Sequence, residues 1–346
     1  MKKRMLIALI AVLALTATAS VVWANGGGLV SYWPFDEGSG TTANDAVNGN
    51  DGMINGATYT TDKAPVIGND YALAFDGNDY VRVLDSGTLE PTTVTVAAWV
   101  KAPSSPGSNR YILGKGGQAC SAASYALYTR GGGLYFYVYN PATSYRLSPG
   151  AGTWVWDGEW HHVVGTYDGS YVRLYVDGAE IGTGTPTSIA IGYGLTPTDD
   201  FFVGAYGGTC DLYFNGLIDE VGIWNRALSA DEVAALSVGV GSVVWLPPIV
   251  LDDWTLNENA TLPIKFQLYG VYGNLLCNDL MPTLQVNGET LDLRFDSTEC
   301  YYISNFRPTS SGLHTAFISL DSVQLGSQGF EVVEPGKANG RGRGNN

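Results

Sequence analysis

Tyrosine alternates with apolar residues in two segments of the chain, and this pattern could bind sugars. The tyrosine side of the first segment carries Tyr135, Tyr137 and Tyr139, and that of the second carries Tyr171, Arg173 and Tyr175. A tyrosine ring stacks on the apolar face of a sugar while its hydroxyl group bonds to the sugar's edge. If both segments lie in one sheet, we expect one continuous platform on which Arg173 holds a carboxylate or a pair of hydroxyl groups. The alternative is that the rings only brace a solvent-facing sheet by pairing across strands.

The apolar residues that alternate with these tyrosines predict a buried core. A period of two indicates β-strands, and the apolar sides are Leu134, Phe136 and Val138 in the first and Val172, Leu174 and Val176 in the second. The second segment belongs to a stretch from Glu159 to Gly182 with turn signals at Asp168-Gly169-Ser170 and Asp177-Gly178. Asp-Gly between alternating runs is a strong hairpin signal. The sequence therefore predicts an antiparallel β-sandwich organised around this hairpin.

The histidines suggest a structural role. The chain has three, and His161 and His162 are neighbours in a predicted strand, so their side chains face opposite ways. No serine or cysteine nucleophile motif accompanies them.

The composition is acidic and rich in turn residues. Eighteen basic residues face 33 acidic ones, and the formal net charge is −15. This balance argues against nucleic acids and anionic membranes as partners, because both require basic patches. The 45 glycines and 15 prolines fit short strands joined by tight turns.

The N-terminus predicts export. Lys2, Lys3 and Arg4 precede an apolar run from Met5 to Leu15, and Val22-Trp23-Ala24 offers small residues for cleavage after Ala24. The alternative is an uncleaved anchor, but the run is shorter than the roughly 20 residues of a spanning helix. We expect a secreted protein.

The cysteines are divided between two halves of the chain. Cys120 and Cys210 precede Gly239, whereas Cys277 and Cys300 follow it. One disulfide in each half is the simplest of three pairings in an oxidising compartment, and free thiols are the alternative.

We expect two β-rich domains. A signal peptide at 1–24 precedes a first sandwich at 25–238, a second at 239–335 and a disordered tail at 336–346. Ser229 and Glu232 form a capping box that begins one helix, which ends near Leu236. About six short strands predict a small immunoglobulin-like sandwich for the second domain.

Six segments of the first domain resemble the laminin-G-like jelly rolls of the concanavalin-A-like lectin/glucanase superfamily. They are YWPFDEGSG from Tyr32, LAFDGNDYVRV from Leu73, TVAAWVKA from Thr95, EWHHVVGTYDG from Glu159, RLYVDG from Arg173 and GLIDEVGIWNRALSADEV from Gly216. The resemblance implies an all-β fold, with an antiparallel jelly-roll sandwich before the smaller one. It also implies an extracellular recognition module, often sugar-binding or adhesive and frequently with structural calcium.

The second domain is similar to an extracellular module named for a P-x-K-F signature. The matching residues are Pro263-Ile264-Lys265-Phe266. This similarity implies no function.

The resemblance also predicts a calcium site. In such jelly rolls the first and last strands are neighbours, so Asp36 and Asp219 are expected to approach each other, with Asp76 or its turn contributing. Calcium accepts carboxylates, backbone carbonyls and water, and it removes the repulsion between two close carboxylates. Alternatively, Asp36 and Asp76 only stabilise turns.

We expect a non-catalytic module that binds an extracellular polysaccharide or another glycan, or acts in adhesion. Related glucanases carry an E-x-D-x-E motif that aligns its carboxylates on one face of a strand, and this chain lacks it. The nearest acidic pair, Asp219-Glu220, is expected to point to opposite faces. The alternatives are a structural spacer without a ligand and a glycan-degrading enzyme.

Overall fold

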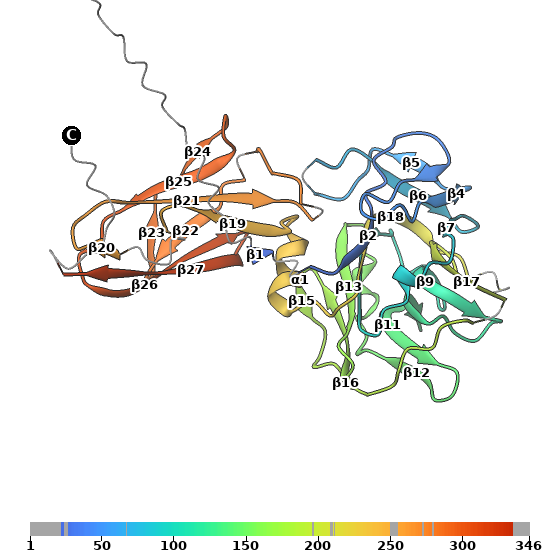
Figure 1. The fold of residues 1–346 in the computed structure, drawn as a ribbon. Coiled ribbons are helices and arrows are strands. Elements are labelled where there is room, and N and C mark those ends of the chain that lie inside the picture. The colour runs from blue at the N-terminus through green and yellow to red at the C-terminus, as the bar shows by residue number, and fades with distance from the viewer. Residues whose placement is uncertain are drawn as a thin grey trace, which may run out of the picture.

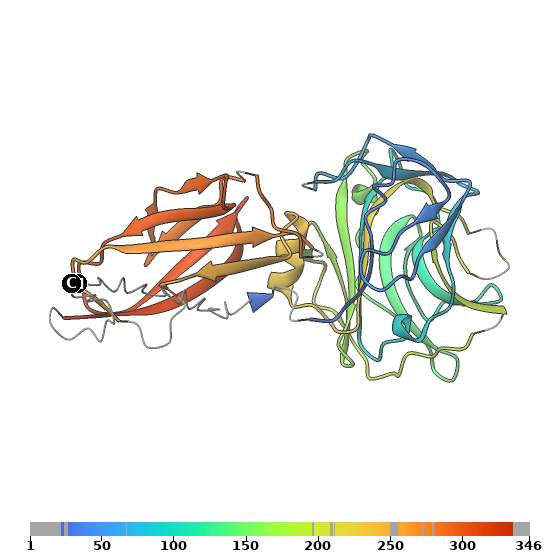
Figure 2. The same cartoon turned by 45° about the horizontal axis from the view of Figure 1, so that its top comes forward.

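The computed structural model describes residues 22–23 and 27–334, apart from residues 67, 196, 208, 209, 211, 250–254, 272 and 279. The predicted tail and the predicted signal peptide, except Val22 and Trp23, lie outside the described residues. The chain is all-β, as predicted, and forms two sandwiches with helix α1 (Ala230–Ser237) between them (Figures 1 and 2). Within the described part, no helix is long and apolar enough to cross a membrane.

Two antiparallel sheets face each other in the first sandwich. The eight-stranded sheet contains, in spatial order, β12 (Ser144–Leu147), β11 (Gly133–Asn140), β10 (Tyr125–Arg130), β9 (Tyr111–Gln118), β17 (Pro197–Val203), β7 (Tyr80–Val83), β4 (Gly52–Asn55) and β3 (Thr42–Ala43). The nine-stranded sheet contains β15 (Ala179–Glu180), β14 (Tyr171–Val176), β13 (His161–Tyr167), β8 (Val94–Lys101), β18 (Asn215–Trp224), β6 (Ala72–Asp76) and β5 (Thr58–Thr60), with β16 (Thr185–Pro186) beside β14 and β2 (Leu29–Trp33) beside β18. Two short 3₁₀ turns, Gly87–Leu89 and Thr153–Val155, connect strands.

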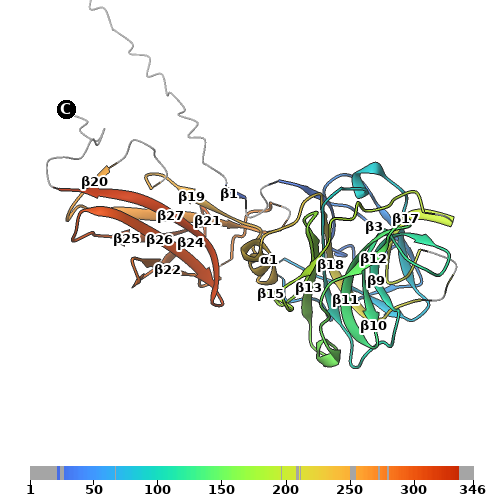
Figure 3. The same ribbon diagram turned by 90° about the horizontal axis from the view of Figure 1, so that it is seen from below.

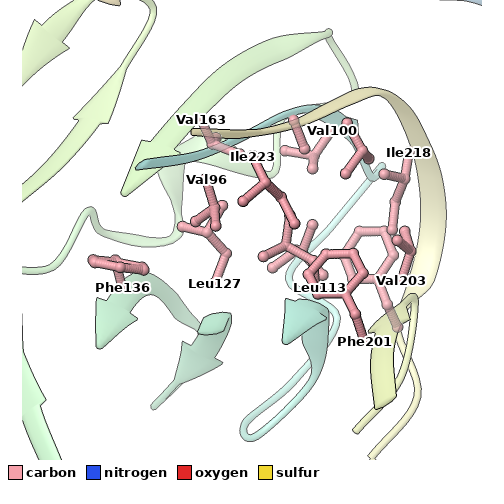
Figure 4. Packing of buried hydrophobic residues seen from close by; sticks show 14 of the residues in the cluster. Val96, Val100, Leu113, Leu127, Phe136, Val163, Phe201, Val203, Ile218 and Ile223 are labelled. Atoms are coloured by element: carbon pink, nitrogen blue, oxygen red, sulfur yellow. The ribbon is translucent and has the colours of Figure 1, made fainter. Parts of the chain in front are cut away.

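The core lies between these two sheets. Figure 4 shows side chains from both sheets meeting there, among them Phe136 and Phe201 from one sheet and Val163 and Ile223 from the other. The six apolar residues predicted to face inward from β11 and β14 all belong to this core. The hairpin of β13 and β14 is also present, with Val163 opposite Val176.

The second sandwich consists of two five-stranded sheets (Figure 3). One contains β1 (Val22–Trp23), β19 (Ser242–Leu246), β21 (Leu262–Tyr269), β25 (Tyr301–Phe306) and β24 (Arg294–Asp296), and the other contains β20 (Thr255–Asn257), β27 (Val323–Val333), β26 (Gly312–Leu320), β22 (Thr283–Val286) and β23 (Glu289–Leu291). The signature residues Pro263 to Phe266 lie in β21, where Ile264 and Phe266 are buried. The similarity of this sandwich to the P-x-K-F module stays a prediction.

Helix α1 packs on both sandwiches. Val233 and Leu236 contact the outer surface of the nine-stranded sheet, whereas Ala235 belongs to the core of the second sandwich. The predicted capping box begins this helix, because Ser229 accepts the N–H of Glu232 and the Glu232 carboxylate accepts the N–H of Ser229. The helix therefore joins the two sandwiches through apolar contacts on both sides.

Both predicted disulfides are confirmed. Cys120 pairs with Cys210 in the first sandwich, and Cys277 pairs with Cys300 in the second.

Gly165 on β13 is required by the packing between the sheets. A Cβ atom at this position would lie 2.2 Å from the ring of Phe136 on β11. We predict that Gly165→Ala lowers the free energy of unfolding by about 1–3 kcal/mol, the usual cost of overpacking a core. Urea denaturation measures this loss.

Gly87 is a matched control, because a Cβ atom there would meet nothing within 4 Å. Gly87→Ala should leave stability nearly unchanged, and Phe136→Leu should reduce the cost of Gly165→Ala. Equal effects of the two alanine variants would contradict this account of the core.

Candidate functional site

The two tyrosine rows lie on different sheets, so the predicted continuous platform is wrong. Tyr135, Tyr137 and Tyr139 lie on β11 of the eight-stranded sheet, whereas Tyr171, Arg173 and Tyr175 lie on β14 of the nine-stranded sheet. Because the apolar residues of both strands face the shared core, the tyrosine rows lie on opposite outer surfaces of the sandwich.

The row on β11 is packed among other tyrosines. Tyr137 is only 3% exposed, and its hydroxyl group lies 3.0 Å from that of Tyr111 and accepts the N–H of Ala123 at 2.8 Å. The Tyr128 ring meets Tyr137 edge-on, with 4.9 Å between the centroids. These contacts support the bracing alternative for this row, and they leave Tyr135 half-buried.

Helix α1 covers one end of the tyrosine row on β14 and leaves the other end exposed. Tyr175 is buried with Val233 and Leu236 of the helix. Tyr171 is exposed, and the Arg173 guanidinium lies over its ring at 4.5 Å. Arg173 also forms ion pairs of 2.9 Å with Asp168 and 3.3 Å with Glu180. The charge of Arg173 is therefore already paired within the hairpin.

Asp36 and Asp219 anchor the loop formed by residues 61–71. Asp219 is fully buried, and its Oδ2 atom accepts the Ala64 N–H at 2.9 Å and the Asn69 amide at 2.7 Å. Asp36 Oδ1 accepts the backbone N–H groups of residues 70 and 71. Burial raises the pKa of Asp219 to about 7, and the nearby negative charge of Asp36 contributes to this rise.

The structure shows only part of the geometry that we expected for the predicted calcium site. Asp36 and Asp219 interact, and the buried Oδ1 atom of Asn69 has no hydrogen-bond partner among the described residues. These oxygen atoms suit calcium in kind. Asp76 instead closes its own turn by accepting the Asn78 N–H at 3.3 Å. In the described part of the chain, the three predicted carboxylates do not form a group with metal-ligand spacing.

One other acidic cluster has metal-ligand spacing, but a lysine fills it. The ligand oxygens of Asp85, Glu90 and Asp199 lie within 4.8 Å of one another. The fully buried Lys115 Nζ contacts Asp85 and lies 3.6 Å from Glu90 and 3.8 Å from Asp199. The ammonium group therefore supplies the positive charge that a metal ion would otherwise provide.

The prediction that Asp219 and Glu220 face opposite sides of β18 is wrong. A β-bulge shifts the pairing between Asp219 and Gly222, and Glu220 has a φ of 52°. Because a bulge inserts an extra residue, it breaks the alternation of side chains. Glu220 instead lines a cavity of about 10 Å³ with Trp99 and His162 on the outer side of the nine-stranded sheet.

This cavity is unsuited to sugar chemistry. Its volume is about that of one water molecule. Burial raises the pKa of Glu220 to about 8 and lowers that of His162 to about 3, so both side chains are neutral at pH 7. Glu220 Oε2 and His162 Nδ1 have no hydrogen-bond partner among the described residues. Glu220 and His162 are therefore two neutral buried polar groups that line one small cavity together with Leu236 of α1.

A larger groove lies nearby on the outer surface of the nine-stranded sheet. Its volume is about 320 Å³, and its lining includes Asp62, Ala74, Lys101, Asn215, Gly216 and Leu217. Leu217 on β18 pairs with Ala74 on β6 and with Lys101 on β8, so these three residues form one row across adjacent strands. We call this feature the Lys101 groove.

The rim of the Lys101 groove is polar and fixed in place. Lys101 Nζ lies 3.0 Å from Asp62 Oδ1 and 2.8 Å from Asp62 Oδ2, and the Trp160 indole N–H donates to Asp62 Oδ1 at 3.0 Å. The Lys101 hydrogen bonds lower the pKa of Asp62, so this carboxylate is ionised at neutral pH. On the opposite side, Asn215 donates its amide to the Asp76 carbonyl at 3.0 Å.

Sequence reasoning missed every residue of the Lys101 groove. The available signals were weak: Lys101 is the charged end of a strand that is otherwise uncharged, and Trp160 directly precedes β13. The register of β6, β18 and β8 and the path of the 61–71 loop bring these residues together.

Glu220 should make the stability of the protein depend on pH. Burial raises its pKa from 4.5 to about 8, so the folded protein retains a proton that the unfolded chain releases between these values. The free energy of unfolding should therefore fall as pH rises from about 5 to 8, by up to about 1.4 kcal/mol per pH unit. Urea denaturation of Glu220→Gln should show a shallower fall, because the amide does not titrate.

Glu159→Gln is the control for this comparison, since Glu159 is exposed. Parallel pH profiles of the wild type and Glu220→Gln would show that Glu220 ionises normally in the folded protein.

Comparisons with known proteins give similarity over part of the chain. This chain is 28% identical to human Pappalysin-1 over 163 residues. The match covers 44% of this chain and 9% of that protein. Mouse Pappalysin-1 is 27% identical over 159 residues, with the same coverage. This chain thus spans about 9% of the length of the curated relatives it matches.

Solved structures with a similar fold include a domain of an arabinanase and a sialidase. Domain 4 of an extracellular arabinanase from Geobacillus stearothermophilus, in complex with arabinotriose, is 20% identical. The match covers 61% of this chain and 98% of that domain, with a TM-score of 0.42. Trypanosoma rangeli sialidase in complex with sialic acid is 18% identical, covering 61% of this chain and 33% of the sialidase, with a TM-score of 0.46.

A family model described as the concanavalin A-like lectin/glucanases superfamily matches residues 75–234. This segment runs from the end of β6 into α1 and includes β8, β13, β14 and β18 of the nine-stranded sheet. The jelly-roll prediction for the first sandwich is thereby confirmed. Residues 75–234 of this chain therefore match the superfamily that the sequence motifs of the first domain resemble.

Proposed function

We propose that this protein is a secreted, non-catalytic module that recognises carbohydrate through the Lys101 groove. The observation that carries the proposal is the combination of an apolar floor, formed by Ala74 and Leu217, with the fixed Asp62–Lys101 pair at its rim. A sugar ring has an apolar C–H face and a polar edge, and binding sites combine apolar surface with a few placed polar groups. Trp160 adds an aromatic ring beside the pair.

Binding without turnover is the better interpretation of this groove. Glycoside hydrolysis uses two carboxyl groups, about 5–5.5 Å apart in retaining enzymes and about 6.5–9.5 Å apart in inverting ones. Asp62 is the only carboxyl group among the described residues that line the groove. Its low pKa and its three hydrogen bonds suit a fixed recognition group more than a proton donor.

The disulfides support the proposed secretion. The two disulfides use all four cysteines, and such bonds persist in oxidising compartments. The proposed cleavage after Ala24 can be tested by N-terminal sequencing of the mature protein.

A Trp160→Ala variant tests the proposed function. We expect the wild type to bind at least one carbohydrate on a glycan array and the variant to bind it about tenfold more weakly, a loss of about 1.4 kcal/mol. Trp154→Ala is the matched control: neither tryptophan lines the groove itself, but Trp160 donates to the rim residue Asp62, whereas Trp154 is 52% exposed and its ring meets His161 edge-on. The melting temperatures of both variants should stay within a few degrees of wild type.

Other outcomes would favour the alternative functions. Absence of glycan binding by the wild type would favour a structural spacer. Release of reducing ends from polysaccharides would identify an enzyme.

We also propose that Asp36 and Asp219 bind a structural calcium ion, now without Asp76. Calcium would offset the repulsion between these two carboxylates and strengthen the 61–71 loop. We predict that EDTA lowers the melting temperature and that added calcium restores it, because a ligand of the folded state stabilises that state. The response should disappear in Asp36→Asn. A wild-type melting temperature that EDTA leaves unchanged would refute the site.

A further inference from the structure

We propose that the Lys101 groove selects uncharged sugars, with the Asp62–Lys101 pair binding two neighbouring hydroxyl groups, and that it rejects carboxylated and sulfated sugars. This inference rests on the proposed function and specifies its ligand class.

The geometry of the ion pair suits two adjacent hydroxyl groups. Lys101 Nζ contacts both Asp62 oxygens, and Trp160 donates to one of them, so three hydrogen bonds orient the carboxylate. An ammonium group has three N–H donors, and a carboxylate has about four lone-pair sites. The pair therefore retains both donor and acceptor capacity. One sugar hydroxyl can accept from Lys101 while its neighbour donates to Asp62, and such charge-assisted bonds are about twice as strong as neutral ones.

The charge balance of the groove disfavours an anionic sugar. Lys101 is the only cation among the described residues that line the groove, and Asp62 neutralises it. The protein as a whole has a formal charge of −15. A carboxylated or sulfated sugar would have to displace Asp62 from Lys101 or enter without a counter-ion. Both routes are costly, whereas hydroxyl groups bind without separating the pair.

The floor of the groove provides room for the apolar face of the ring. Ala74 and Leu217 have short or medium apolar side chains, and Gly216 between Leu217 and Asn215 has none. A Cβ atom on Gly216 would lie 2.6 Å from the Lys101 carbonyl oxygen, so β18 can approach β8 this closely only with glycine here. Asn215 uses its amide N–H on the Asp76 carbonyl, and its carbonyl oxygen is an additional acceptor for a hydroxyl group at the rim.

The test compares neutral and anionic glycans under the same conditions. The purified full-length protein is applied to immobilised neutral oligosaccharides (glucans, mannans, arabinans and galactans) and to polygalacturonate, alginate, sialylated oligosaccharides and dextran sulfate. Every measurement is made once with calcium and once with EDTA: the first condition keeps any calcium bound at Asp36 and Asp219, and the second shows whether a bridging metal ion links the acidic protein to an acidic glycan. We expect binding to one or more neutral ligands and at least tenfold weaker binding to every anionic one.

An Asp62→Asn variant tests the assigned role of the ion pair. The amide can still accept from Trp160, but the Lys101 charge is no longer neutralised. Affinity for the neutral ligand should fall about tenfold or more, because a hydrogen bond to a charged acceptor is lost. Retention of anionic glycans should rise, since the groove then carries a free cation. Lys101→Met should lose the neutral ligand without gaining an anionic one.

Asp168→Asn is the matched control. Asp168 is also a partly exposed member of an ion pair, with Arg173, and the substitution changes the net charge by the same amount outside the groove. It should change neither affinity. The melting temperature of each variant verifies that the fold is retained.

The outcomes separate this inference from the proposed function. Wild-type binding to anionic glycans that depends on Trp160 would overturn the inference and leave glycan recognition in place. Loss of the neutral ligand in Asp62→Asn without any gain for anionic ligands would overturn the assigned charge role of the pair. Absence of binding to every glycan would overturn both proposals.

Discussion

Hydrogen bonds to one buried carboxyl group hold the loop that completes the Lys101 groove. Asp219 accepts from Ala64 and Asn69, and Asp62 lies two residues before Ala64. Besides this anchor, Asp62 is held by its backbone N–H bond to the Thr60 hydroxyl group, by the surface ion pair with Lys101 and by one bond from Trp160. Exposed ion pairs alone contribute about 0–1 kcal/mol, whereas a buried acceptor that loses its donors costs more. The polar rim therefore depends on Asp219.

The position of the core limits which surfaces of the sandwich can carry polar and aromatic groups. Both large sheets direct their alternating apolar residues toward each other, so polar and aromatic groups occupy the outer surfaces and the rims. Much of those outer surfaces is then covered: tyrosines and short loops pack on the eight-stranded sheet, and α1 covers part of the nine-stranded sheet. The Lys101 groove lies on the outer surface of the nine-stranded sheet, with Asp62 in its lining beside residues of β6, β8 and β18.

Positive charge is scarce in this acidic chain, and several cationic side chains in its described part form ion pairs with carboxylates. Lys115 lies within ion-pair distance of three acidic groups, Arg82 binds Asp200, and Arg226 binds the Glu232 carboxylate at the start of α1. Lys101 follows the same rule through Asp62. A neutral ligand can use such a pair intact, and this is why the charge pattern, more than the shape of the groove, indicates the ligand class.

Local rules in the sequence determined much of the fold. Alternation with a period of two identified the inner faces of β11 and β14, the Asp-Gly turn identified the hairpin of β13 and β14, and Ser229 with Glu232 marked the start of α1. The division of the cysteines between the halves of the chain predicted both disulfides. Most of these features depend on residues that are close in the chain, and the disulfides depend on choosing the simplest of three pairings. A single sequence therefore reveals them.

Only the tertiary structure decided which surfaces meet. The tyrosine rows belong to different sheets because strand order follows long-range pairing, which alternation does not specify. The bulge at Asp219 and Glu220 reversed an expectation drawn from regular pleating. Asp62, Lys101 and Trp160 lie far apart in the sequence and meet only through the register of three strands and a loop fixed by one buried carboxyl group. The sequence determined the strands and their inner faces, whereas the groove arises from contacts between distant residues that no local pattern encodes.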